Sequence, residues 1–164
     1  MSDITRTWPI SGKFSEEQRE LYEAVLNVQR DCIGRCRANA RMTLDKLHAH
    51  AEDLLRSELS QLGFAVTGSG GQKMLTTLFP HHISHYIGLD VHDTPTIGRQ
   101  EKLREGMVVS VEPGVYVPDT EEYPARFRGM GIRIEDTVAV GAEGPTVCSV
   151  EAVKEVDDIE ALRD

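Results

Sequence analysis

The chain has 164 residues, of which 40% are hydrophobic and 27% are charged, so it can bury the core of one compact domain but not of two. Its formal net charge of −9 at pH 7 argues against nucleic acid and membranes as partners, because the phosphate backbone and anionic lipids are negatively charged too. No apolar run approaches the ~18 residues of a membrane span. The three cysteines are too few for a disulfide framework and suit a reducing compartment.

Two amphipathic helices are predicted in the first half of the chain. Residues 4–14 are rich in β-branched and aromatic side chains and include a turn, which indicates an extended segment leading into a helix. Ser15 and Gln18 match a capping box at the start of that helix. Apolar residues follow at helical spacing, namely Leu21, Val25, Val28 and Cys32. The second helix is expected to begin near Thr43 and to stop at Gly63.

Both helices carry residue types that can bind metals. Cys32 and Cys36 lie one helical turn apart on an apolar face, where buried thiols explain them better than a metal site does. His48 and His50 are two positions apart and cannot share a helix face. We therefore expect the two histidines to be surface residues rather than a ligand pair.

The second half of the chain reads mostly as strands. The sequence TGSGG at 67–71 lacks the spacing of a phosphate-binding loop, so we expect a flexible loop there. From residue 107 onward the apolar period becomes two, in MVVSVEPGVYV, GIRIEDTVAV and TVCSVEAV. Helices followed by strands predict an α+β domain in which helices cover an antiparallel sheet.

Two of these predicted strands each carry a glutamate that needs an explanation. Alternation places Glu112 on the face opposite Val109 and Val111, and Glu135 on the face opposite Ile134. An acid within an apolar strand costs several kcal/mol unless it is paired or bound to a cation. For Glu135, a salt bridge with Arg133 or a solvent-facing strand surface are the plain alternatives.

The segment HHISHYIGLDVHD, residues 81–93, contains four of the six histidines. Each histidine alone is explained by hydrogen bonding within a half-buried segment. Histidines together with strand glutamates and aspartates form the mixture of oxygen and nitrogen donors that suits Mn, Co, Fe or Zn. The combination therefore favours a metal site.

Four longer segments carry a resemblance to a known family. They are SDITRTWPISGKFSEEQRELYEAVL, HHISHYIGLDVHDTP, VVSVEPGVYVP and FRGMGIRIED. They resemble, in order and spacing, the Xaa-Pro aminopeptidases, which are the aminopeptidase P family of dinuclear metallopeptidases, and the mitochondrial-type branch in particular. The resemblance implies part of the pita-bread (creatinase/aminopeptidase) fold. It also implies a metal-dependent aminopeptidase that releases the N-terminal residue from peptides with proline in second position.

The resemblance also implies roles for individual residues. Four positions match metal ligands of the family, namely Asp3, His85, Glu112 and Glu135. Three further positions match active-site residues that act on the substrate or line the site, namely His92, His81 and Arg133. His82 matches no functional position of the family. The implied cofactor is a pair of divalent metal ions, with Mn²⁺ as the expected metal.

The family has a fifth ligand, an aspartate that precedes the position of Asp3 and that this chain does not contain. The resemblance therefore implies that residues 1–164 are the C-terminal portion of the catalytic domain, without its first half and without the N-terminal domain. We expect impaired activity. The alternatives are a non-catalytic lobe that acts as a binding or structural partner, and a relative of the proline dipeptidases. Assembly as a homo-oligomer, and a mitochondrial or cytoplasmic location, stay open.

Overall fold

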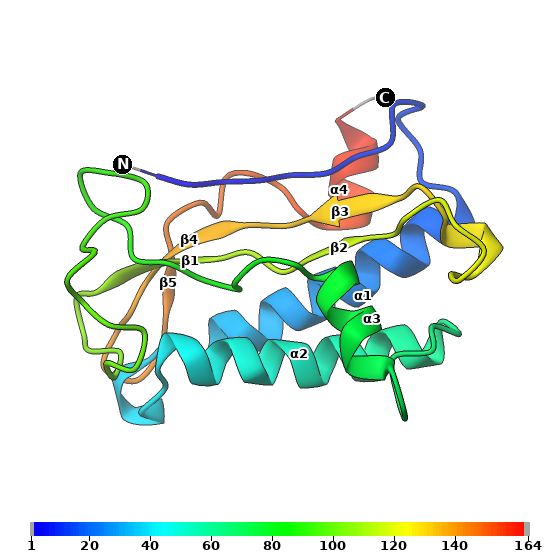
Figure 1. The fold of residues 1–164 in the computed structure, drawn as a ribbon. Coiled ribbons are helices and arrows are strands. Elements are labelled where there is room, and N and C mark those ends of the chain that lie inside the picture. Colours follow the sequence, from blue (N-terminus) through cyan, green and yellow to red (C-terminus); the bar gives the residue numbers. More distant parts are fainter. Residues whose placement is uncertain (1, 163–164) are drawn as a thin grey trace.

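The computed structural model describes residues 2–162, which form helices packed against antiparallel strands (Figure 1). The helices are α1 (Glu16–Gly34), α2 (Leu44–Gln61), α3 (Gly71–Leu78) and α4 (Val156–Ala161), with two 3-10 turns at Ala38–Ala40 and Ala125–Phe127. The strands are β1 (Val108–Val111), β2 (Gly114–Tyr116), β3 (Gly131–Arg133), β4 (Asp136–Ala139) and β5 (Thr146–Val147). No helix among these residues is long and apolar enough to cross a bilayer.

The strands form two antiparallel ladders that share one register. β1 pairs with β4, which also pairs with β5, and β2 pairs with β3. β1 and β2 belong to one extended segment, and β3 and β4 to another. The two segments are interrupted at the same level, after Val111 in the first and after Arg133 in the second. Pro113 contributes to this break because it has no backbone N–H to donate to a ladder. The Ile134 N–H still donates to the Pro113 carbonyl at 3.2 Å, so the two ladders continue one another.

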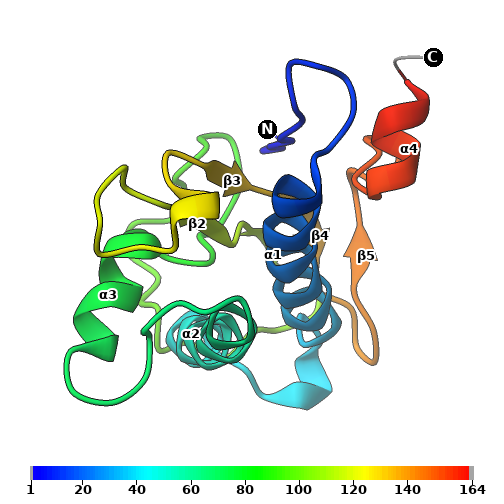
Figure 2. The same cartoon turned by 90° about the vertical axis from the view of Figure 1, so that its right-hand side faces the viewer.

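The predicted helices are confirmed, including how they begin and end. The Ser15 hydroxyl accepts from the Gln18 N–H, and the Gln18 side chain accepts from the Ser15 N–H, which completes the capping box. Thr43 caps α2 through the Lys46 N–H. Gly63 follows α2 with φ +91°, a conformation that glycine adopts without strain. α1 and α2 pack side by side beneath the strands, as Figures 1 and 2 both show.

The loop expected at 67–71 is present up to Gly70, but one helix was not predicted and two expectations about local structure are wrong. Residues 71–78, after the glycine-rich turn, form the helix α3, which begins behind Gly70 at φ +91°. Within TVCSVEAV only Thr146–Val147 is a strand; at Ser149 the Thr137 N–H donates to the side-chain hydroxyl rather than to a backbone carbonyl of a ladder. The histidines of α2 are half-buried rather than on the surface.

The core lies between the helices and the strands. Cys32 and Cys36 are fully buried there as free thiols, as expected, and burial raises the pKa of each to about 12. The N-terminal segment crosses the far side of the strands from α2 (Figure 1). It joins them through an antiparallel bridge between Thr5 and Glu135. The start of the chain is therefore held at the break between the ladders.

Candidate metal centre

The two strand glutamates lie at the break between the ladders and oppose one another. Val111 pairs with Asp136 on one side of the break, and Gly114 pairs with Arg133 on the other. Because the register is the same on both sides, Glu112 falls opposite Glu135. Like charges at opposing strand positions are destabilising, so this pair is stabilised when a cation binds or when one carboxyl is protonated.

His85 is held close to these acids by the neighbouring strand. Its backbone N–H donates to the Ser110 hydroxyl at 3.0 Å, and its carbonyl accepts from the Ser110 N–H at 2.9 Å. Its ring Nδ1 lies 3.2 Å from the Tyr86 carbonyl, which fixes the tautomer with the proton on Nδ1. The Nε2 lone pair is then free to bind a metal. Nε2 lies 3.3 Å from Glu112 Oε1 and 3.5 Å from Asp3 Oδ2.

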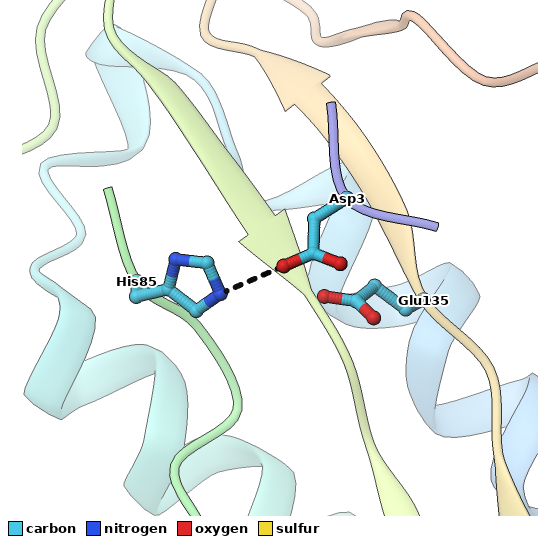
Figure 3. A group of neighbouring side chains, drawn as sticks. All are labelled: Asp3, His85 and Glu135. Carbon is cyan, nitrogen blue, oxygen red and sulfur yellow. Dashed lines mark ion pairs between the residues drawn. The ribbon is translucent and has the colours of Figure 1, made fainter. Parts of the chain in front are cut away.

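Asp3 reaches the centre from the N-terminal segment. Its N–H donates to the Thr137 hydroxyl at 2.9 Å, and that hydroxyl donates to the Asp3 carbonyl at 2.8 Å. Figure 3 shows the Asp3 and Glu135 carboxylates and the His85 ring pointing toward one another. One ligand atom from each of these three residues lies within 4.8 Å of the others.

Glu135 is the most deeply buried of the predicted ligands. Its side chain is 2% exposed, and its Oε1 is buried without a hydrogen-bond partner among the described residues. Burial raises the pKa of Glu135; the hydrogen bond from Thr5 lowers it, whereas Glu112 and Asp3 raise it further. The pKa of Glu112 is also raised by burial, against the lowering effect of His85.

The plain alternatives for Glu135 fit this geometry poorly. A solvent-facing position is excluded because the side chain is buried. The salt bridge with Arg133 is long, at 4.0 Å, and the Arg133 side chain is 41% exposed. An unpartnered buried oxygen among three acids and one imidazole is the environment that a divalent cation would stabilise. The residues therefore fit a metal of the class that the sequence indicated.

The other predicted site residues lie around this cluster. The His92 ring meets the His85 ring edge to face, with centroids 4.5 Å apart, and His92 itself is exposed. His81 Nε2 lies 2.9 Å from the Tyr116 hydroxyl, and its Nδ1 lies 3.0 Å from the His82 carbonyl. Burial lowers the pKa of His81, which favours the neutral ring. The His82 side chain is exposed.

Sequence reasoning missed Tyr116 as a partner of His81. The signal was available, because the alternation that places Glu112 on one strand face also places Gly114 and Tyr116 there. A Cβ at Gly114 would lie 2.8 Å from the Tyr116 hydroxyl and 3.1 Å from His81 Nε2. The absence of a side chain at position 114 therefore leaves room for the His81–Tyr116 contact.

His48 was expected to lie on the surface, but it is half-buried and contacts the segment 81–93. Its Nδ1 accepts from the Ile83 N–H at 3.3 Å, and its ring packs against Phe79 and His82. His50 Nε2 lies 2.6 Å from Asp31. The expectation that these two histidines do not form a ligand pair is consistent with these separate contacts.

Comparison with known proteins identifies the family. The model of metallopeptidase family M24 matches residues 1–142. Intermediate cleaving peptidase 55 of Saccharomyces cerevisiae is 51% identical over 160 residues, which cover 97% of this chain and 30% of that protein. Human Xaa-Pro aminopeptidase 3 is 42% identical over 165 residues, which cover 99% of this chain and 32% of that protein. The chain thus spans less than a third of the length of these two curated relatives.

Solved structures show the same fold. The crystal structure of Icp55 from Saccharomyces cerevisiae matches with a TM-score of 0.92 and 49% identity over 98% of this chain and 38% of that chain. Zn-substituted E. coli aminopeptidase P in complex with product matches with a TM-score of 0.89 and 36% identity, over 98% of this chain and 37% of that chain. The predicted pita-bread fold is confirmed by these matches. Sequence, fold and the acid-rich cluster agree that the chain belongs to metallopeptidase family M24.

Proposed function

We propose that the protein is a metal-dependent aminopeptidase that releases the N-terminal residue from peptides with proline in second position. The names of several relatives, Xaa-Pro aminopeptidase 3 among them, support this substrate class. Because the chain spans less than a third of the two relatives described above, the proposal concerns the activity of the whole protein. Within it, we assign residues 1–164 to the C-terminal portion of the catalytic domain.

One observation carries the proposal of a metal centre: Glu135 Oε1 is buried, has no hydrogen-bond partner among residues 2–162, and lies beside other potential ligands. We propose Asp3, His85, Glu112 and Glu135 as ligands of two divalent metal ions, with Mn²⁺ as the metal. Three carboxylates supply the negative charge that two close cations require. Glu112 is not in the group of Asp3, His85 and Glu135 whose ligand atoms lie within 4.8 Å of one another. Its carboxylate nevertheless lies 3.3 Å from His85 Nε2, the atom that is also close to Asp3.

The chemistry follows from this donor set. When bound, divalent metals act as Lewis acids that polarise the scissile carbonyl and activate a water molecule for attack. We assign substrate contact to His92, which is exposed and in ring contact with His85. Its imidazole can donate a hydrogen bond to the oxygen on which charge develops, which is typically worth ~10²-fold or more.

His81 and Arg133 form a second polar group beside the ligands. The proton on His81 Nδ1 faces the His82 carbonyl, so the lone pair of Nε2 accepts the Tyr116 hydroxyl proton. The neutral ring that burial favours can exchange its hydrogen bond from Tyr116 for the proton that the attacking water loses, and can pass that proton to the departing proline nitrogen. The Arg133 guanidinium, partly exposed, adds positive charge on the substrate side.

A non-catalytic lobe that binds a partner is the second candidate. The described residues bring ligand atoms of Asp3, His85 and Glu135 within 4.8 Å of one another but leave Glu112 outside that group, which favours this candidate. For location, we propose mitochondria, since the Arabidopsis thaliana relative is named mitochondrial.

Metal binding and peptide cleavage separate the two candidates. We expect isothermal titration of Mn²⁺ into the protein to show binding, and an Xaa-Pro peptide to lose its N-terminal residue when Mn²⁺ is present. His85→Ala and Glu112→Ala should abolish both. His50→Ala is the matched control, because His50 bonds Asp31 instead of the cluster. Binding that survives in His85→Ala would place the metal elsewhere, and binding without cleavage would favour the non-catalytic lobe.

A further inference from the structure

The hydroxyl of Thr5 lies between Arg133 and Glu135. We propose that Thr5 is a positioning residue that holds the Glu135 carboxylate in the orientation in which its Oε1 faces the metal centre. This inference rests on the metal centre proposed above. It assigns a task to a side chain that is neither a ligand nor a substrate contact.

The backbone places Thr5 directly beside the glutamate. The Thr5 N–H donates to the Glu135 carbonyl at 3.3 Å, and the Glu135 N–H donates to the Thr5 carbonyl at 3.0 Å. Two residues that exchange both backbone bonds are direct cross-strand partners, so their side chains emerge on the same face. Thr5 is β-branched and has few side-chain conformations on a strand, so its hydroxyl is held next to the carboxylate.

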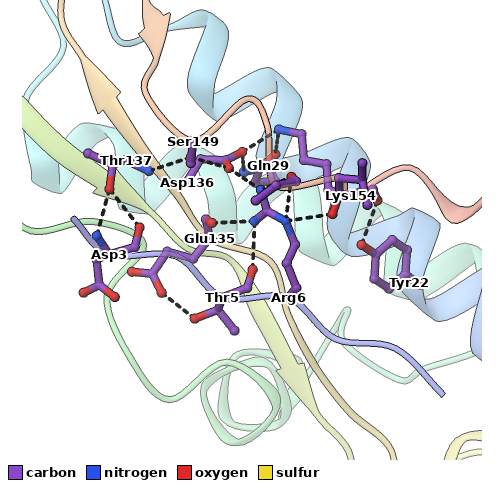
Figure 4. A network of polar contacts seen from close by, with 12 residues as sticks. Asp3, Thr5, Arg6, Tyr22, Gln29, Glu135, Asp136, Thr137, Ser149 and Lys154 are labelled. Carbon is purple, nitrogen blue, oxygen red and sulfur yellow. Dashed lines mark hydrogen bonds and ion pairs between the residues drawn. The ribbon is translucent and has the colours of Figure 1, made fainter. Parts of the chain in front are cut away.

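The direction of the hydrogen bonds determines where the hydroxyl proton goes. The Arg133 Nε–H donates to Thr5 Oγ1 at 3.2 Å, and Thr5 Oγ1 donates to Glu135 Oε2 at 2.5 Å. A guanidinium only donates, so the threonine proton is directed toward the glutamate. Figure 4 shows the Thr5 hydroxyl meeting one oxygen of the Glu135 carboxylate. Oε2 thereby accepts one hydrogen bond that fixes the carboxylate, and Oε1 is the oxygen that stays buried without a partner among the described residues.

Thr7 provides an internal comparison on the same segment. Its hydroxyl donates to the Arg133 carbonyl at 2.9 Å and accepts from the Arg133 N–H at 3.2 Å. The Thr7 hydroxyl thus joins two backbone segments and contacts no carboxylate. At Thr5 the backbone already makes the cross-strand bonds, so the hydroxyl is available to hold Glu135.

Three variants test the different roles of Thr5 and Thr7 by titration with Mn²⁺. Thr5→Val removes the hydroxyl at nearly constant shape and should raise the Mn²⁺ dissociation constant roughly 10- to 100-fold, as expected when the partner of a metal ligand is lost. Thr5→Ser keeps the hydroxyl and should restore wild-type affinity. Thr7→Val should bind as tightly as wild type. Equal affinity in Thr5→Val and wild type, or an equal loss in Thr7→Val, would overturn the proposal.

A second readout needs no metal. In crystals of the metal-free wild type and Thr5→Ser proteins, Glu135 should adopt one orientation with Oε2 on the hydroxyl. In Thr5→Val, or in Thr5→Ala if the valine variant does not fold, the carboxylate should rotate or occupy several orientations. An unchanged carboxylate would refute the role of Thr5 alone. Absence of Mn²⁺ binding by the wild type would instead refute the metal centre.

Discussion

Glu135 and Asp136 are adjacent acids with opposite surroundings. Asp136 is fully buried and accepts hydrogen bonds from four side chains on its two oxygens (Figure 4). The donors are Arg6 at 2.7 Å, Lys154 at 2.5 Å, Gln29 at 2.6 Å and Ser149 at 2.7 Å. Glu135 accepts one side-chain hydrogen bond, from Thr5, and keeps one oxygen without a partner among the described residues.

The pKa values of the two acids diverge accordingly. Burial alone would raise the pKa of Asp136, but its four donors outweigh burial and lower it to about 2. Burial raises the pKa of Glu135, and the neighbouring acids add to the effect. Two cations and two neutral donors satisfy Asp136 within the protein, so its role is structural. Glu135 lacks such compensation among the described residues, which is why we propose that a cation binds beside it.

Removal of Asp136 should cause the largest loss of stability. Asp136→Ala leaves Arg6 and Lys154 without their buried partner, and breaking such a pair costs about 3–5 kcal/mol. Urea unfolding followed by circular dichroism measures the change. Asp31→Ala is the control, because Asp31 is 43% exposed and exposed ion pairs contribute about 0–1 kcal/mol. Similar losses in the two variants would remove the distinction between the acids.

Mn²⁺ should stabilise the folded protein by binding at Glu135. A ligand that binds only the folded state contributes about 2.7 kcal/mol at 100 times its dissociation constant. Thermal unfolding should therefore shift upward with Mn²⁺ and return after chelation. Asp31→Asn should keep the shift and Glu135→Gln should lose it. A shift that persists in Glu135→Gln would contradict the assignment.

Acid should weaken the Asp136 network. The folded-state pKa of Asp136 lies below its ordinary value of 3.8, so its stabilisation is fully present above about pH 4 and is lost as the pH falls toward 2. The depression corresponds to about 2 kcal/mol. Urea unfolding across this range should show the loss in the wild type and not in Asp136→Asn. Parallel curves for the two proteins would contradict the pKa argument.

Glu135→Gln should have the smallest effect on the metal-free protein. Glutamine keeps the shape of the side chain and removes a buried charge that faces Glu112 and Asp3. We expect the free energy of unfolding without metal to fall much less than in Asp136→Ala, because the glutamine oxygen can still accept from Thr5 and no buried cation loses its partner. Metal-free urea unfolding tests this. A loss as large as that of Asp136→Ala would show that Glu135 is already satisfied.

The sequence predicted the features that depend on local chemistry. The capping box at Ser15 and the alternation that sets Glu112 and Glu135 apart from their apolar neighbours are read within a few residues. The helix α3 was missed because it is short and because its N-cap residue, Gly70, is a glycine with positive φ. The Ser149 hydroxyl bonds Asp136 and the Thr137 N–H, thirteen and twelve residues away, and no local pattern reports these contacts.

The difference between Glu135 and Asp136 is not visible in the sequence. Gln29 and Arg6, which bond Asp136, precede it by 107 and 130 residues, so only folding brings them together. Asp3 likewise carries no local signal of metal binding, and it was identified through resemblance to a family. The position of Thr5 beside Glu135 requires the bridge between the N-terminal segment and the strand.

Anomalous scattering from crystals grown with Mn²⁺ tests the central claim most directly. We predict a peak within coordination distance of His85 Nε2 and of the carboxylates of Asp3 and Glu135, with Glu135 Oε1 as a ligand. Asp136 should show no peak and should keep its four side-chain donors. A well-ordered crystal with Mn²⁺ bound elsewhere, or with Glu135 Oε1 still lacking a metal at saturating Mn²⁺, would contradict the account.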